Sequence, residues 1–174
     1  MVGIVGVALL LLVVVFFLRK SSAPHDIFGK FGLSPGAFTL ISSDLGDSAP
    51  RQMLRGNGVS GEPDALFTAK SGRKIVVGEY KSRKFKGFVR PYEFFQTMLY
   101  MGMARQIHNV SEAMGVIAYA DQRVQIHFDQ DVYDAIVGLR VELFMSFKAR
   151  KPINARPLQK RMNVLNLNRH VTFG

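Results

Sequence analysis

The chain has 174 residues, enough for one domain with a hydrophobic core, and its net charge of +10 comes from 23 lysines and arginines against 13 aspartates and glutamates. Such an excess of positive charge indicates a polyanionic partner, either nucleic acid or an anionic membrane surface. No cysteine is present, which excludes disulfides, thiolate zinc sites and cysteine-bound iron–sulfur clusters, so any metal ion must bind oxygen or imidazole ligands.

The chain begins with an apolar segment. Residues 2–18, VGIVGVALLLLVVVFFL, are 17 uncharged residues. A helix of this length spans about 25 Å, near the lower limit for crossing a bilayer. Arg19 and Lys20 follow directly, and positive residues stay on the cytoplasmic side. We therefore predict a transmembrane helix over residues 1–20, anchored in the lipid bilayer of the cell membrane through residues 2–18, with a single pass and the C-terminal domain in the cytoplasm. The alternatives are a signal peptide cleaved near Ser21–Ala23 and a buried helix of a soluble domain.

A tether and the first half of a domain follow. Residues 21–50 are rich in Ser, Gly, Pro and Asp, and they predict a tether and irregular entry segment with a short strand at 37–42. We assign residues 51–150 to one domain, in which residues 51–58 are expected to end a short helix. Residues 59–83 predict a β-hairpin, because two strand-like runs flank a turn.

The second half of the domain combines a helix, a pair of strands and a final helix. Pro91 begins a predicted helix that ends near His108, and strands are predicted at 115–120 and 123–128. A final helix, capped by Asp129 or Asp131, reaches about Lys148, with an amphipathic stripe at positions 132, 136, 139, 143 and 147. Residues 151–174 form a basic C-terminal tail. Hairpin, helix, hairpin, helix predicts an α/β or α+β fold in which a central mixed sheet is flanked by helices.

The first hairpin opposes two carboxylates. If Ser71 and Gly72 form the turn, or if the loop spans 70–73, opposed residue numbers sum to 143, so that Leu66 faces Val77 and Asp64 faces Glu79. Directly opposed residues have Cβ atoms about 4.5–5.5 Å apart, and like charges at that distance are destabilising. A divalent cation between them would reverse the sign of the interaction.

The surrounding residue types suit such a cation. Mg²⁺ and Mn²⁺ prefer carboxylate, carbonyl and water oxygens, so Asp64, Glu79 and the backbone carbonyl of Tyr80 are candidate ligands. Strand alternation puts Lys81 on the same face as Glu79, where its ammonium group would stabilise negative charge on a phosphate transition state. The alternative is an exposed sheet face that carries ordinary cross-strand charge pairs.

Three short motifs add a resemblance. GEPDALF, VVGEYKSR and FFQTMLY resemble the PD-(D/E)xK nucleases, and most of all the RecB-like branch that includes the CRISPR-associated RecB-like exonucleases. Gly61 to Asp64 match the G-x-x-D motif of that branch, Glu79 and Lys81 match E-x-K, and Gln96 and Tyr100 match Q-x-x-x-Y. The likeness covers about residues 55–128 and implies a restriction-endonuclease-like core within residues 51–150.

The resemblance also implies roles and exposes two departures. Asp64 and Glu79 would hold the metal, Lys81 would be the catalytic lysine, and Gln96 and Tyr100 would contact substrate or support the catalytic residues. Many members complete the metal site with an upstream acid or histidine, for which the candidates here are His25, Asp44, Asp47 and Glu62. The CRISPR-associated members usually carry an iron–sulfur cluster bound by cysteines, and this cysteine-free chain has none.

A basic segment follows the predicted catalytic lysine. KSRKFKGFVR, residues 81–90, places Arg83, Lys84 and Lys86 where they could bind phosphates, while Phe85 and Phe88 would stack on unpaired bases or pack inward. The tail could bind DNA or lie on anionic lipid. We predict a membrane-tethered deoxyribonuclease that depends on Mg²⁺ or Mn²⁺, with single-stranded DNA and duplex ends among its candidate substrates. The alternatives are a nuclease-like fold that binds nucleic acid without cutting it, and a membrane adaptor whose basic face binds lipid headgroups.

Overall fold

The structure is a computed structural model, and it describes residues 24–46, 49–162 and 167–173. The predicted transmembrane helix over residues 1–20 lies outside these ranges. Within them, no helix is both long enough and apolar enough to cross a membrane.

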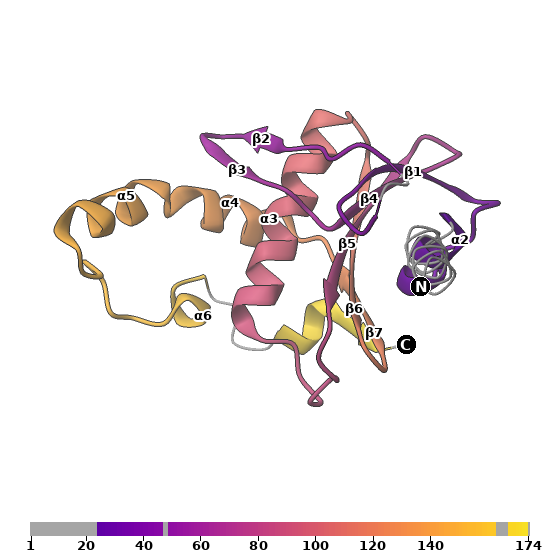
Figure 1. The fold of residues 1–174 in the computed structure, drawn as a ribbon. Coiled ribbons are helices and arrows are strands. Elements are labelled where there is room, and N and C mark those ends of the chain that lie inside the picture. The colour runs from indigo at the N-terminus through magenta and orange to yellow at the C-terminus, as the bar shows by residue number, and fades with distance from the viewer. Residues whose placement is uncertain (1–23, 47–48, 163–166, 174) are drawn as a thin grey trace, which may run out of the picture.

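A six-stranded sheet organises the molecule (Figure 1). Its strands, in spatial order, are β1 (Phe38–Ser43), β4 (Ala65–Ala69), β5 (Lys74–Lys81), β6 (Glu112–Tyr119), β7 (Arg123–His127) and β8 (Val171–Phe173). β5 and β6 pair in parallel, and the other neighbouring strands pair antiparallel. A parallel pair needs a long crossover connection, which is supplied here by helix α3 (Pro91–Ile107). The predicted mixed α+β architecture, a sheet flanked by helices, is confirmed.

Helices cover both faces of the sheet. α3 packs on one face, and helix α2 (Pro24–Phe31) packs on the other, where Phe31 joins a smaller apolar cluster. β5 lies between them, and its residues 75–79 are buried, which is why it reads as an unbroken apolar run instead of an alternating one. Gly78 allows α2 to approach, because a Cβ there would lie 2.7 Å from the ring of Phe31.

The hairpin register is as predicted. Leu66 pairs with Val77 and Thr68 with Ile75. The connection is the four-residue loop over residues 70–73, the second of the two loops that give this register, and Gly72 N donates to the Ala69 carbonyl at 2.8 Å. The predicted helix from Pro91 and the strands now called β6 and β7 are also confirmed, as is the short strand expected near residues 37–42, which is β1.

The prediction for residues 51–58 is wrong. They contain no helix, and a small hairpin forms there from β2 (Leu54–Gly56) and β3 (Val59–Gly61). Asn57 and Gly58 both have positive φ, 52° and 71°. Two-residue hairpin loops of the type favoured by Asn-Gly need φ above zero at both positions. The Asn-Gly dipeptide was thus the signal that the sequence reading passed over.

The predicted final helix is broken in two. α4 (Gln130–Gly138) is capped by Asp129, whose Oδ1 accepts a hydrogen bond from Val132 N at 3.1 Å, and α5 (Arg140–Ala149) follows after Leu139. Gly138 weakens a continuous helix at this point. α4 buries Val132 and Tyr133, whereas α5 has no buried residue.

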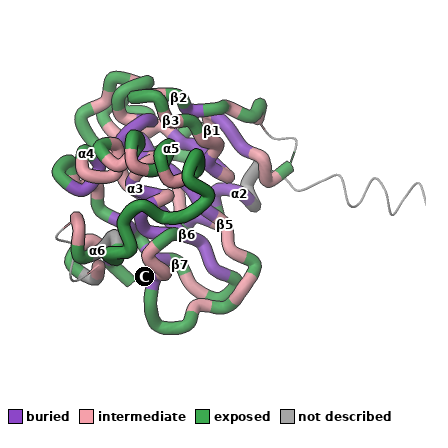
Figure 2. Tube along the Cα trace, turned by 90° about the vertical axis from the view of Figure 1, so that its left-hand side faces the viewer, coloured by how far each residue is buried: buried purple, intermediate pink, exposed green. Residues whose placement is uncertain are grey.

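The segments outside residues 51–150 also contribute regular structure. The expected entry segment contains α2 and β1, and the expected basic tail contains α6 (Leu158–Arg161), the 3₁₀ helix η1 (Leu167–His170) and β8. β1 and β8 are the two edge strands of the main sheet. Figure 2 shows how the purple, buried segments follow the sheet and α3, while α5 and residues 150–157 after it are almost entirely exposed.

Candidate active site

The hairpin brings Asp64 and Glu79 together. Asp64 directly precedes β4, and continuing the ladder beyond the pair of Ala65 and Gly78 places it opposite Glu79. The Asp64 carboxylate accepts a hydrogen bond from the backbone N–H of Tyr80 at 2.5 Å. The backbone N–H of Asp44 donates to the Asp64 carbonyl at 3.1 Å, so the loop after β1 meets the same point.

Glu79 is an acid buried without full compensation. Its side chain is 2% exposed. Oε2 lies 3.0 Å from Lys81 Nζ, while Oε1 is buried and has no hydrogen-bond partner. Burial and the negative charge of Asp64 raise the pKa of Glu79 from 4.5 to about 7, against the opposing effect of Lys81. One carboxylate of the pair is therefore poised to hold a proton, or a cation, near neutral pH.

The two partners of Glu79 respond to the same surroundings. Burial raises the pKa of Asp64, the Tyr80 N–H lowers it, and the charge of Asp44 raises it again, so that the net direction is upward. Burial alone would lower the pKa of Lys81, but its contact with Glu79 outweighs this and raises the pKa. Lys81 therefore carries its positive charge throughout the physiological pH range.

Two carboxylate oxygens near the pair of Asp64 and Glu79 have no hydrogen-bond partner. Glu79 Oε1 and Asp44 Oδ1 are both buried and without a hydrogen-bond partner, and Asp44 is close enough to Asp64 to raise its pKa. Strand geometry points the N–H and C=O of one residue toward the same neighbour, so the Tyr80 carbonyl faces the side on which its N–H meets Asp64. Within the described ranges, no three acidic or histidine side chains converge into a closed metal cage. Mg²⁺ often binds through one or two carboxylates and retains several waters.

Of the two upstream candidates whose side chains are described, Asp44 is close enough to Asp64 to raise its pKa. Glu62 lies 3.9 Å from Arg51, with which it forms an ion pair. The side chains of His25 and Asp47 lie outside what the structure describes.

Tyr100 of the Q-x-x-x-Y motif packs against Gly61 of the G-x-x-D motif. Gln96 Nε2 donates to Tyr100 Oη at 3.3 Å, as expected for residues that share one face of a helix. Tyr100 lies against Gly61, where a Cβ would stand 2.3 Å from the Tyr100 ring. A glycine three residues before Asp64 is therefore needed so that the β3 strand can approach α3.

A second acid, Glu93, was missed. It is 1% exposed and binds both Arg83 Nη2, at 2.8 and 2.9 Å, and the Tyr119 hydroxyl, at 2.9 Å. Burial opposes ionisation, but the hydrogen bonds from Arg83 and Tyr119 outweigh it, so the pKa of Glu93 is lowered. Its position three residues into a Pro-initiated helix, where the side chain also accepts from Arg90 N at 3.3 Å, was the available signal.

Arg83, which the sequence predicted to bind substrate phosphates, takes part in this network. Its guanidinium group is committed to Glu93 and lies 4.8 Å from the centre of the Tyr119 ring. Lys84 and Lys86 are exposed, as phosphate contacts would require. Phe85 packs inward against Tyr119, at 5.0 Å between ring centres, whereas Phe88 is exposed.

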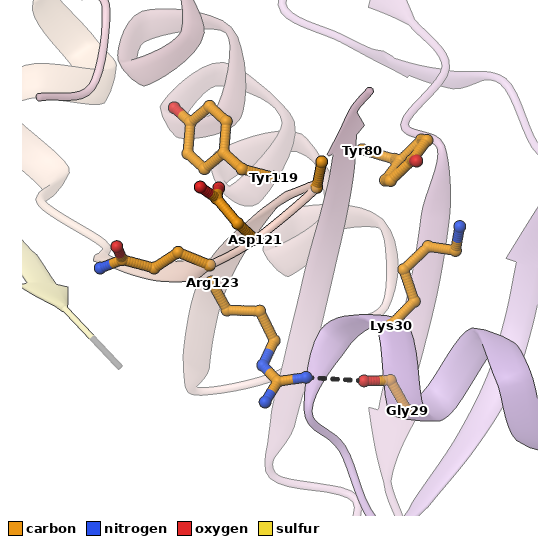
Figure 3. A pocket seen from close by; sticks show the side chains of 8 residues that line it. Gly29, Lys30, Tyr80, Tyr119, Asp121 and Arg123 are labelled. Carbon is orange, nitrogen blue, oxygen red and sulfur yellow. Dashed lines mark hydrogen bonds between the residues drawn. The ribbon is translucent and has the colours of Figure 1, made fainter. Parts of the chain in front are cut away.

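A cavity of about 480 Å³ opens at the carboxyl ends of β5 and β6. Figure 3 shows Lys30, Tyr80 and Arg123 around it; Lys30 Nζ lies 3.9 Å from the centre of the Tyr80 ring, and Arg123 Nη1 donates to the Gly29 carbonyl at 2.8 Å. Asp121 lines the opposite side. Ligands of α/β sheets bind beyond the carboxyl ends of parallel strands, and these ends also carry Lys81.

Comparisons with known proteins leave the assignment open. No protein-family model matches the chain, and no curated protein matches it. Among solved structures, one described as "Crystal structure of SSO0001" is similar at 18% identity with a TM-score of 0.41. The similar region covers 76% of this chain and 60% of that one.

Proposed function

We propose that the protein is a divalent-metal-dependent nuclease that hydrolyses phosphodiester bonds of DNA. The observation that supports this most directly is the buried Glu79, which faces Asp64 and touches Lys81, with one carboxylate oxygen unpartnered. A buried acid with a raised pKa beside a second acid lowers the stability of the fold. Such strongly perturbed acids cluster at functional sites.

The chain's residues divide the work. Asp64 and Glu79 would hold Mg²⁺ or Mn²⁺, with the Tyr80 carbonyl as a further oxygen ligand. When bound, such an ion supplies a nucleophile by lowering the pKa of its water. Lys81 holds a positive charge beside the place where negative charge develops on the phosphate. Gln96 and Tyr100, which share one face of α3, would contact the substrate or support the catalytic residues.

The basic surface favours nucleic acid as the substrate. Lys84 and Lys86 are exposed on the loop after β5, within five residues of Lys81. Cations around a phosphodiesterase site neutralise the phosphates on either side of the scissile bond. We infer a restriction-endonuclease-like core, supported by the β4–β5 hairpin, the parallel β6 and the α3 crossover. Membrane tethering through residues 2–18 is part of the same proposal and rests on the sequence alone.

The test is a cleavage assay with the full chain in detergent. End-labelled single- and double-stranded DNA is incubated with Mg²⁺, with Mn²⁺ or with EDTA, and the product ladder separates exonuclease from endonuclease action. Glu79→Ala should abolish cleavage while leaving DNA binding intact.

The matched control is Glu112→Ala. Glu112 is an exposed acid of the same sheet, paired with Lys74 at 3.3 Å, and exposed pairs of this kind contribute little. The Glu112→Ala variant should therefore cleave DNA at the wild-type rate. Cleavage by Glu79→Ala at the wild-type rate would show that the site is misassigned, and DNA binding without metal-dependent cutting would favour a non-catalytic nucleic-acid-binding protein.

A further inference from the structure

The part of the chain from Arg140 to Arg156, here called the arm, exposes an unusual amount of apolar surface. Of the eleven large hydrophobic side chains exposed within the described residues, six belong to the arm. They are Val141, Leu143, Phe144, Met145, Phe147 and Ile153. Proteins that stay in water rarely gather such side chains on one segment, and a cluster of this kind marks an interaction surface.

The arm stands away from the rest of the fold. In Figure 1, α5 extends from α4 at the end of the molecule farthest from α2. None of its ten residues is buried, and its most exposed apolar residue, Phe147, keeps 72% of its surface in solvent. On its inner side, Leu139 and Leu143 border an apolar groove of about 440 Å³ over Phe95 and Leu99 of α3. The apolar surface is therefore continuous from the groove to the outside of α5.

Positive charge surrounds this apolar surface. The arm carries five lysines and arginines and a single acid, Glu142, which gives a net charge of +4. Arg161 binds both oxygens of Glu142, so its negative charge is neutralised within the protein. Lys148, Arg150 and Lys151 are exposed directly after the apolar residues of α5.

We propose that the arm binds the interface of an anionic lipid bilayer. Aliphatic and aromatic side chains would enter the boundary between headgroups and acyl chains, and the cations at the end of α5 would contact anionic headgroups. A second copy of the chain fits less well, because two arms would bring two charges of +4 together. Nucleic acid also fits less well, because base stacking needs aromatic rings, and four of the six exposed apolar residues are aliphatic.

The test uses the full chain, so that residues 2–18 act equally in every variant. The chain has no cysteine, so a single cysteine places an environment-sensitive fluorophore at one position. Phe144→Cys and Phe147→Cys report on the arm, and Ser71→Cys in the exposed β4–β5 turn is the control. Each is reconstituted in vesicles of phosphatidylcholine alone and of phosphatidylcholine with phosphatidylglycerol, with and without nitroxide-labelled lipid.

We expect the two arm labels, and not the control label, to shift to the blue and to be quenched by nitroxide lipid when phosphatidylglycerol is present. Lys148→Gln with Lys151→Gln should lower the docking equilibrium constant about 30-fold, at about fivefold for each cation near a charged surface. Lys70→Gln with Arg73→Gln removes the same charge from the control turn and should change nothing.

Other results would overturn the proposal. Arm labels that stay in water with anionic vesicles would exclude lipid contact. Labels equally shielded in neutral vesicles, or labels that quench one another as protein density rises, would indicate cover by a protein segment or a second copy. A shift that requires an added oligonucleotide would assign the arm to nucleic acid. None of these readouts depends on cleavage, so the proposed nuclease activity can fail without affecting this result.

Discussion

Glu79→Gln should make the metal-free protein more stable at neutral and alkaline pH while it abolishes cleavage. The side chain is 2% exposed, and its pKa is raised from 4.5 to about 7, chiefly by burial and then by Asp64. At 1.36 kcal/mol for each pKa unit, ionising Glu79 in the folded state costs about 3 kcal/mol. Glutamine keeps the shape of the side chain and removes this cost.

The sign of the pH dependence follows from the raised pKa. Below the unfolded pKa of 4.5, both states hold the proton and Glu79 imposes no penalty. Between that value and about 7, the folded state binds the proton more tightly, so stability falls as pH rises; above about 7 the full penalty is present. Wild type and Glu79→Gln should therefore be equally stable at low pH and diverge above neutrality.

Thermal unfolding followed by circular dichroism in EDTA measures this difference. A change of about 3 kcal/mol corresponds to roughly 10 °C in Tm for a domain of this size. Added Mn²⁺ should raise the Tm of the wild type by binding the folded state, and it should have much less effect on Glu79→Gln. Glu112→Gln, at the exposed pair, controls for loss of an acid from the sheet. A Glu79→Gln protein that unfolds below the wild type above pH 7 would refute the reasoning, because the Lys81 contact would then outweigh burial.

Three further predictions concern the supporting residues. Gly61→Ala should cost about 1–3 kcal/mol by driving a methyl group into Tyr100, and unchanged thermal stability would contradict the close approach of β3 to α3. Glu93→Gln should destabilise the fold by about 2 kcal/mol by weakening the hydrogen bonds of a buried charge, with no change in Tm as the opposing result. Replacing Lys84 and Lys86 by glutamine should reduce the slope of log binding constant against log salt by about 0.7–0.9 per residue. If titrations over a range of salt concentrations show the same slope, DNA follows another path.

Local patterns alone determined the arrangement of the hairpin. Side chains alternate with a period of two, and the short loop over residues 70–73 sets the register, so the opposition of Asp64 and Glu79 follows from sequence spacing. Pro91 likewise marks the start of α3. These features depend on residues that are close together in the chain, and they survive whatever packs around them.

The environment of these residues depended on distant segments. Glu79 acquires its raised pKa because β5 is covered on both sides, by β4 and β6 within the sheet and by helices on its faces, and no local pattern states which strand becomes central. The contact of Glu93 with Arg83 and Tyr119 joins three elements that pack together only in the folded chain.

For α5, too, the sequence pattern predicted the helix but not what surrounds it. The spacing of positions 132, 136, 139, 143 and 147 predicted one helix with an apolar stripe against the core. α4 buries Val132 and partly buries Ile136, but Leu143 and Phe147 of α5 are exposed. A periodic pattern states which side chains lie on one face of a helix. Whether a partner surface exists for that face is decided by the size and shape of the folded domain, because the hydrophobic effect acts on any apolar surface without specifying what covers it.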